Sequence, residues 1–158
     1  MLLSIKIQAM LKTFFSRLMP LITLLIVFAS AVSPRNGLPE DLLKYTNEYR
    51  RSKGLSNLEM RTDLNSIARN HSEEMASGKT SFGHNGYDKR VRKIKEIFKT
   101  CTVAENVAYG ANNAKEAFTI WRNSSGHRKN MLGGYKYIGI GTAKNNRGVI
   151  YYTEIFVK

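Results

Sequence analysis

The sequence predicts an α+β domain in which helices cover a small antiparallel sheet. Two observations support this fold class. Amphipathic helical patterns occupy most of the chain between residues 38 and 132, and two runs rich in β-branched and aromatic residues end it. Helices followed by a terminal hairpin are typical of α+β domains.

The first 31 residues have the layout of a secretory signal. Basic residues precede an apolar run over residues 18–29, and Ala29-Ser30-Ala31 matches a small-residue cleavage pattern. The basic residues are Lys6, Lys12 and Arg17. About a dozen apolar residues are few for a transmembrane helix, and an uncleaved N-terminal anchor stays open as the alternative.

We therefore expect a signal peptide over residues 1–31, a linker over 32–37 and one folded domain over 38–158, secreted or otherwise extracytoplasmic. The 158-residue chain has a formal net charge of +13, and its first 31 residues hold three basic and no acidic side chains, which leaves +10 on the remainder. Such a charge favours anionic surfaces such as acidic lipid or cell-wall polymer. Export argues against nucleic acid as a partner.

Cysteine occurs once, at Cys101. A single cysteine cannot form an internal disulfide. The domain must therefore be held together by packing, and Cys101 is expected to behave as a small apolar residue.

Helical periodicity accounts for most of the domain. It predicts a first helix between Pro39 and Gly54, and further helices over residues 62–77, 88–99 and 112–124. We expect Thr62 or Asp63 to cap the second of these. Ser125 is the expected N-cap of a last helix that carries His127 and Arg128 in its first turn.

Strand patterns occupy the rest. Residues 101–110 are rich in β-branched and small side chains and predict a short strand. Residues 137–143 and 148–157 flank the turn-rich KNNR segment and predict an antiparallel hairpin.

Four residues are candidates for chemistry. His71 lies on an apolar helix face and is expected to be a core residue, whereas the loop residue His84 fits a ligand-binding or a plain surface role equally well. Glu105 lies in an uncharged strand-like segment, where burial requires a partner. The helix dipole at His127 favours a neutral imidazole, which can bind a metal or accept a proton. The spacings between these residues match no compact metal motif.

The order of several sequence motifs along the chain indicates a family resemblance. Residues 42–76 are followed by GHNGYDKR, AENVAYG, AFTIWRNSSGHRKNMLGGYKYIGIG and YYTEIF. In this order the segments resemble the motifs of the CAP superfamily, which includes the cysteine-rich secretory proteins. They are similar to its two opening helices, its histidine loop, its Glu-Asn motif, its Trp helix with the Gly-His motif, and its final strand. The likeness is strongest to the compact bacterial members.

The resemblance implies a three-layer α-β-α sandwich with a central cavity. It implies that His84 and His127 hold a divalent metal, often zinc, and that Glu105 lines the cavity as a candidate catalytic carboxylate. Further cavity-lining positions implied by the motifs are Asn106, Ser124 and Glu154. Ser124 stands where many members carry a second glutamate, and Glu154 replaces their usual glutamine.

Two functions follow as expectations. The first is an exported, non-enzymatic binding module whose cavity takes a metal ion or a small amphiphile. The second is a metal-dependent hydrolase of peptide or cell-wall polymer with Glu105 as general base. Because Ser124 replaces the other glutamate of the family, a two-carboxylate mechanism is disfavoured, and the binding module is the preferred expectation. A structural envelope protein with a disused cavity is a third possibility.

A basic helix adds an expected surface. Its cations either form a solvated face or bind anionic lipid or cell-wall polymer. The candidate surface residues are Lys89, Arg92, Lys93 and Lys95.

Overall fold

The computed structural model describes residues 37–158, so the predicted signal segment and nearly all of the predicted linker lie outside it. The described range contains helices α2 (Leu38–Arg51), α3 (Thr62–Ala76), α4 (Tyr87–Phe98), α5 (Ala114–Asn123) and α6 (Ser125–Met131), with strands β1 (Glu59–Met60), β2 (Val103–Tyr109), β3 (Tyr137–Lys144) and β4 (Ile150–Val157). None of these helices is long and apolar enough to cross a bilayer.

The strands form one sheet in the order β1-β3-β4-β2. The predicted hairpin is present, because β3 pairs antiparallel with β4, and β2 pairs antiparallel with the other side of β4. The three long strands form the expected small antiparallel sheet, and the two-residue strand β1 adds one parallel pairing to β3. This order leaves β2 as an edge strand.

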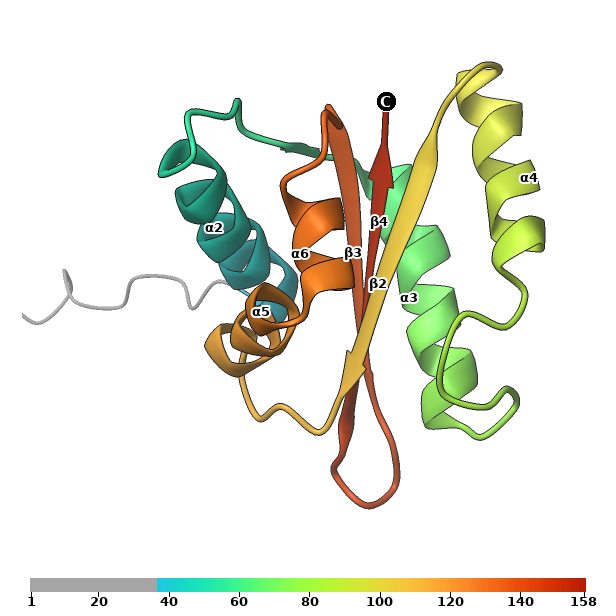
Figure 1. Cartoon of the computed structure of the whole chain (residues 1–158). Coiled ribbons are helices and arrows are strands. Elements are labelled where there is room, and N and C mark those ends of the chain that lie inside the picture. The colour runs from blue at the N-terminus through green and yellow to red at the C-terminus, as the bar shows by residue number, and fades with distance from the viewer. Residues whose placement is uncertain (1–36) are drawn as a thin grey trace, which may run out of the picture. The chain divides into compact units, whose positions relative to one another are not determined.

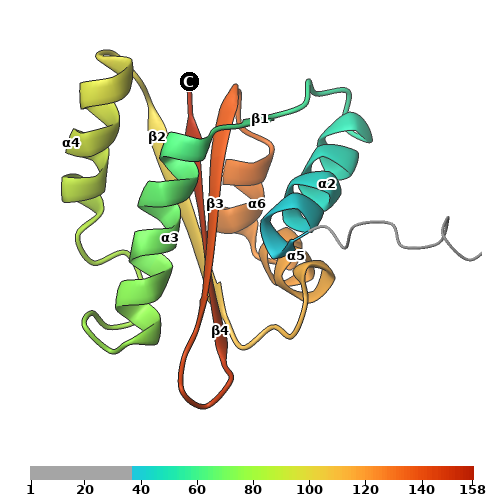
Figure 2. The same ribbon diagram turned by 180° about the vertical axis from the view of Figure 1, so that it is seen from behind.

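Helices cover both faces of the sheet, as expected for a three-layer α-β-α sandwich. Figure 1 shows α2, α5 and α6 on one side of the strands and α3 and α4 on the other. The reverse view in Figure 2 shows α3 lying along β3. The edge strand β2 therefore runs between α6 and α4.

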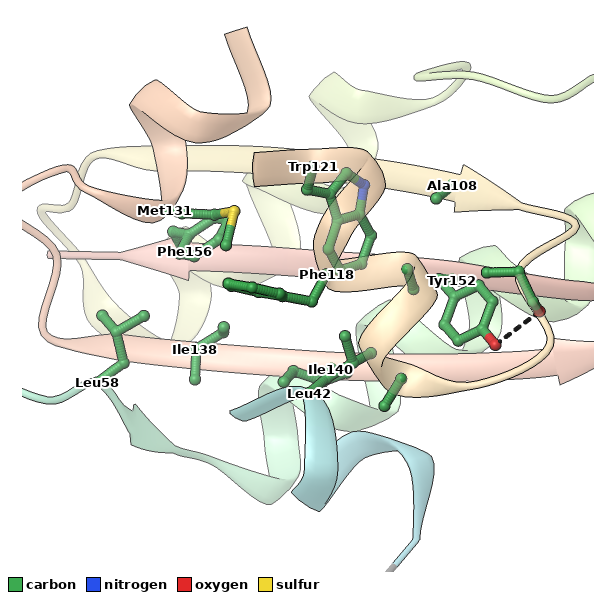
Figure 3. Packing of buried hydrophobic residues seen from close by; sticks show 13 residues of the cluster. Leu42, Leu58, Ala108, Phe118, Trp121, Met131, Ile138, Ile140, Tyr152 and Phe156 are labelled. Carbon is green, nitrogen blue, oxygen red and sulfur yellow. Dashed lines mark hydrogen bonds between the residues drawn. The ribbon is translucent and has the colours of Figure 1, made fainter. Parts of the chain in front are cut away.

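The larger core lies between the sheet and α2, α5 and α6 (Figure 3). Trp121 of α5 is fully buried and donates its indole N–H to the Val107 carbonyl at 3.1 Å. The Tyr152 hydroxyl donates to the Ala111 carbonyl at 3.0 Å. Both large aromatic residues thus bury their rings while their polar atoms stay hydrogen-bonded, which is the usual condition for such burial.

A smaller core lies on the α3 and α4 side and contains Leu64, Ala68, Ile94, Ile155 and Val157. The free Cys101 is partly buried and packs against this cluster, as expected for a small apolar residue.

Two predicted caps were wrong. The residue before α3 is Arg61, so Thr62 and Asp63 belong to the first helical turn. Ser124 is the N-cap of α6, because its backbone is extended while its carbonyl accepts the Arg128 N–H at 2.9 Å. Ser125 is consequently the first helical residue.

Candidate functional site

The edge strand β2 presents neighbouring residues to opposite sides of the sheet. Successive side chains of a strand point to opposite faces. Glu105 accordingly reaches Arg90 of α4, whereas Asn106 reaches the His127 carbonyl of α6. The candidate residues from both helical layers are thereby brought to the same strand.

Glu105 and Arg90 form a buried, bidentate ion pair. Arg90 Nε donates to Glu105 Oε2 and Arg90 Nη2 to Oε1, both at 2.6 Å. Glu105 is 6% exposed and Arg90 is 8% exposed. Burial of a carboxylate requires such a partner, so the expectation that Glu105 is paired is confirmed.

His71 supports this pair from α3. Its Nε2 lies 2.9 Å from the Gly83 carbonyl and its Nδ1 lies 3.1 Å from Arg90 Nη1. A carbonyl only accepts and a guanidinium only donates, so the hydrogen is on Nε2 and the ring is neutral. Burial, the largest cause, also lowers the pKa of His71. His71 is therefore the satisfied core histidine that was predicted.

His84 contacts Glu105 from the loop before α4. Its Nδ1 lies 2.9 Å from Glu105 Oε1, and its side chain is half exposed. Because a paired carboxylate accepts hydrogen bonds, Nδ1 carries the hydrogen and donates. The other nitrogen, Nε2, is then the one available to a ligand, in the arrangement that orients many metal-binding histidines.

A hydrogen-bond network joins β2 to α6 on the other side. The Asn106 amide donates to the His127 carbonyl at 3.2 Å and to Glu154 Oε2 at 3.3 Å. Asn130 donates to Asn106 Oδ1 at 2.9 Å and to the Glu105 carbonyl at 3.3 Å. Asn106 is fully buried and does not line the hollow beside His84; its hydrogen bonds join α6 to the strand.

His127 lies in the first turn of α6, as predicted. Its Nδ1 is buried and has no hydrogen-bond partner in the described part of the chain. Burial, and secondarily the charge of His84, lower the pKa of His127. His127 therefore favours the neutral form that a metal ligand requires.

A hollow of about 480 Å³ lies beside His84 and Glu105, and neither His127 nor Asn106 is among the residues that line it. His84, Tyr87 and Glu105 line one part of it, and Lys129 and Asn130 of α6 contribute another. It is open to solvent across the edge of β2. Its lining combines aromatic surface with a few polar groups, which is typical of small-ligand sites.

The remaining candidate residues lie away from the hollow. Ser124 caps α6 without a side-chain capping bond. Glu154 is fully buried, and accepts hydrogen bonds from Asn106 and, at 3.4 Å, from Thr46. Burial raises the pKa of Glu154 to about 8, so this carboxyl is largely protonated at neutral pH.

Three site residues were not predicted: Arg90 as the partner of Glu105, His71 as the support of Arg90, and Asn130. Arg90 is one of the many cations of the basic helix α4. It lies one turn before the buried Ile94, and therefore on the inward face of α4. That spacing was the available signal.

The donor set fits a divalent cation only in part. Two imidazoles with one carboxylate behind them would hold a zinc ion with water in the remaining positions. Within residues 37–158, no group of three or more histidine, cysteine or acidic side chains is arranged to hold a metal ion. His84 and His127 thus supply at most two protein ligands, fewer than the three or four of typical zinc sites.

The chain matches known proteins over most of this domain. The model of the cysteine-rich secretory protein family, CAP, matches residues 43–156. Two uncharacterized proteins of Bacillus subtilis (strain 168) are similar in sequence: YkwD, 32% identical over 116 residues, and the membrane protein YlbC, 31% identical over 125 residues. The matches cover 71% and 75% of this chain but only 45% and 34% of the relatives, less than half of each.

Solved structures share the fold. An extracellular SCP-domain protein of Bacillus anthracis superposes with a TM-score of 0.66 at 24% identity, covering 82% of this chain and 45% of that one. A cysteine-rich secretory protein of Staphylococcus aureus superposes with a TM-score of 0.58 at 28% identity, and the match covers 78% of this chain and 40% of that one. An outer surface protein of Borrelia burgdorferi superposes with a TM-score of 0.64 at 20% identity, and the match covers 78% of this chain and 96% of that one.

Proposed function

The chain belongs to the cysteine-rich secretory protein (CAP) family, and from that premise we propose that it is an exported binding module. His84 and His127 would hold a divalent cation, with zinc as the first candidate, beside the hollow at the edge of β2. The extracellular and outer-surface relatives support an extracytoplasmic location. So does the secretory pattern of residues 1–31.

One observation carries the proposal. Glu105 accepts the Nδ1 hydrogen of His84, which directs Nε2 away from the carboxylate. Hydrogen-bonded carboxylates of this kind fix the tautomer and orientation of metal-binding histidines. The unpartnered, buried Nδ1 of His127 is a second polar atom that a bound group would satisfy.

The same geometry disfavours the hydrolase alternative. Both Glu105 oxygens accept hydrogen bonds from Arg90, and Oε1 also accepts from His84. A general base must reach the proton that it removes. With its oxygens engaged in a buried pair, Glu105 orients His84 instead.

Zinc titration of the full chain by calorimetry tests the proposal. We expect binding that is lost in His84→Ala and in His127→Ala, and weakened about 10- to 100-fold in Glu105→Gln, the usual range for outer-shell partners. Lys129→Gln is the matched control, because it alters the same hollow without removing an imidazole. Circular dichroism verifies folding of each variant.

Two results would overturn the proposal: no zinc binding by the wild-type chain, or unchanged binding in both histidine variants. Hydrolysis of peptide or wall polymer that a chelator and His127→Ala both abolish would favour the enzyme instead.

A further inference from the structure

A polar groove separates α3 from α4 on the face opposite α6. Its volume is about 320 Å³. Lys89 and Lys93 of α4 line one wall, and Ser66 and Asn70 of α3 line the other, with Ile67 between them. In each wall the polar residues are four positions apart, and therefore one above the other on the same helix face.

The charge of the groove is positive and uncompensated. Within residues 37–158, neither Lys89 nor Lys93 lies within ion-pair distance of an acidic side chain. Glu74 also lines the groove, but its carboxylate is paired with Lys79, whose Nζ lies 2.9 Å from Glu74 Oε1. Arg90 is committed to Glu105. The two lysines are thus the free charges at this site.

We propose that this groove binds a linear, hydroxyl-bearing polyanion, namely a polyol phosphodiester polymer. Successive phosphates would meet Lys89 and Lys93, which lie about 6 Å apart along the helix. The Ser66 hydroxyl donates its hydrogen to the Thr62 carbonyl, so its oxygen would accept from a polyol hydroxyl. The Asn70 amide would also meet the polyol, and Ile67 its carbon chain. This proposal concerns a different site from the histidine pair and does not rest on the proposed function.

The side chains available bind anions as point charges. Lysine meets an anionic group as a point charge, whereas bidentate recognition of carboxylate or phosphate relies on a free arginine fork. Four of the five N–H donors of Arg90 are already used, by Glu105, His71 and Asn85. The groove therefore offers separated point charges and no free fork.

The packing of α4 favours a polymer over a bilayer. An interfacial helix inserts its apolar face into the lipid. The apolar face of α4 is occupied, because Ile94 is fully buried in the smaller core and Phe98 packs against the same cluster. Ile97 is the one large hydrophobic residue that α4 exposes. A recessed groove admits a chain but excludes a flat membrane.

A comparison of two double variants tests the proposal. Lys89→Gln/Lys93→Gln removes the groove charges, and Arg92→Gln/Lys95→Gln removes two exposed cations from the same helix outside the groove lining. The full chain is titrated into fluorescein-labelled poly(glycerol phosphate) at about 50 mM salt, with a chelator present. Fluorescence anisotropy reports binding, and vesicles containing phosphatidylglycerol are the second probe.

We expect the groove variant to bind the polymer about tenfold more weakly, and the control variant to lose less than about threefold, because only the groove lysines would contact it. Raised salt should weaken wild-type binding. An equal loss of polymer affinity in both variants would show that the helix attracts the polymer through its overall charge, and would overturn the proposed groove site. The proposal would also be overturned if the wild-type chain did not bind the polymer. It would be overturned as well if the groove substitutions weakened vesicle binding more than polymer binding.

Discussion

At the scale of single residues, the chemistry of Glu105 depends on Arg90. The sequence showed that a carboxylate in an uncharged strand needs a partner, and the family resemblance implied that Glu105 lines a cavity with His84 and His127. It did not identify Arg90, because that residue lies among exposed cations of the same helix. Only the docking of α4 on α3 and the sheet buries Arg90 against Glu105 and separates it from the others.

Substituting Arg90→Met should destabilise the domain by about 3–5 kcal/mol, since Glu105 would remain buried without its counter-charge. Adding Glu105→Leu should recover part of this loss, because no unpaired charge is then buried. Urea unfolding of the single and double variants measures both effects. Arg92→Met, at an exposed position of the same helix, is the control and should change stability little. An additive double variant would contradict the coupling.

At the scale of elements, local periodicity predicted the long helices and the hairpin but not β1 or the cap of α6. A two-residue strand has almost no pattern of its own, and β1 exists because Glu59 and Met60 pair with β3. Ser124 and Ser125 are equally good caps in sequence. The choice between them depends on where α5 ends, which its packing determines.

The glycines of β3 are an element-scale feature whose role the sequence did not show. A Cβ added at Gly141 would overlap the backbone of Ala68 and Arg69, and one at Gly139 would overlap Leu64. These glycines therefore allow α3 to lie directly on the strand. The alternation YIGIG directs its two isoleucines toward the larger core and its two glycines toward α3.

Gly141→Ala should accordingly destabilise the domain by about 1–3 kcal/mol or more, the range for overpacking, because backbone rather than a flexible side chain must move. Gly134→Ala is the matched control, since a Cβ there meets nothing within 4 Å. Thermal unfolding compares the two. A Gly141→Ala variant as stable as the control would show that α3 does not lie so closely on β3.

At the scale of the whole molecule, buried titratable groups give stability two opposing pH dependences. Burial lowers the pKa of His71 and His127, so the unfolded chain binds more protons just below pH 6.5 and stability rises with pH there. Burial raises the pKa of Glu154 from 4.5 to about 8. Between those values the folded chain binds more protons at Glu154, and stability falls as pH rises.

Glu154→Gln isolates the second effect, because a neutral amide replaces a carboxyl that stays protonated in the folded state. Between about pH 5 and 8, the stability of the variant relative to wild type should increase by up to about 1.4 kcal/mol per pH unit. Both chains retain His71 and His127, so the histidine contribution cancels in the difference. Urea unfolding at several pH values measures this difference in stability.

Parallel curves of stability against pH for the variant and the wild type would mean that Glu154 ionises in the folded protein as readily as in the unfolded chain. A variant that loses stability at pH 5 would instead show that the carboxyl has a packing role between Thr46 of α2 and Asn106 of β2 that an amide does not reproduce.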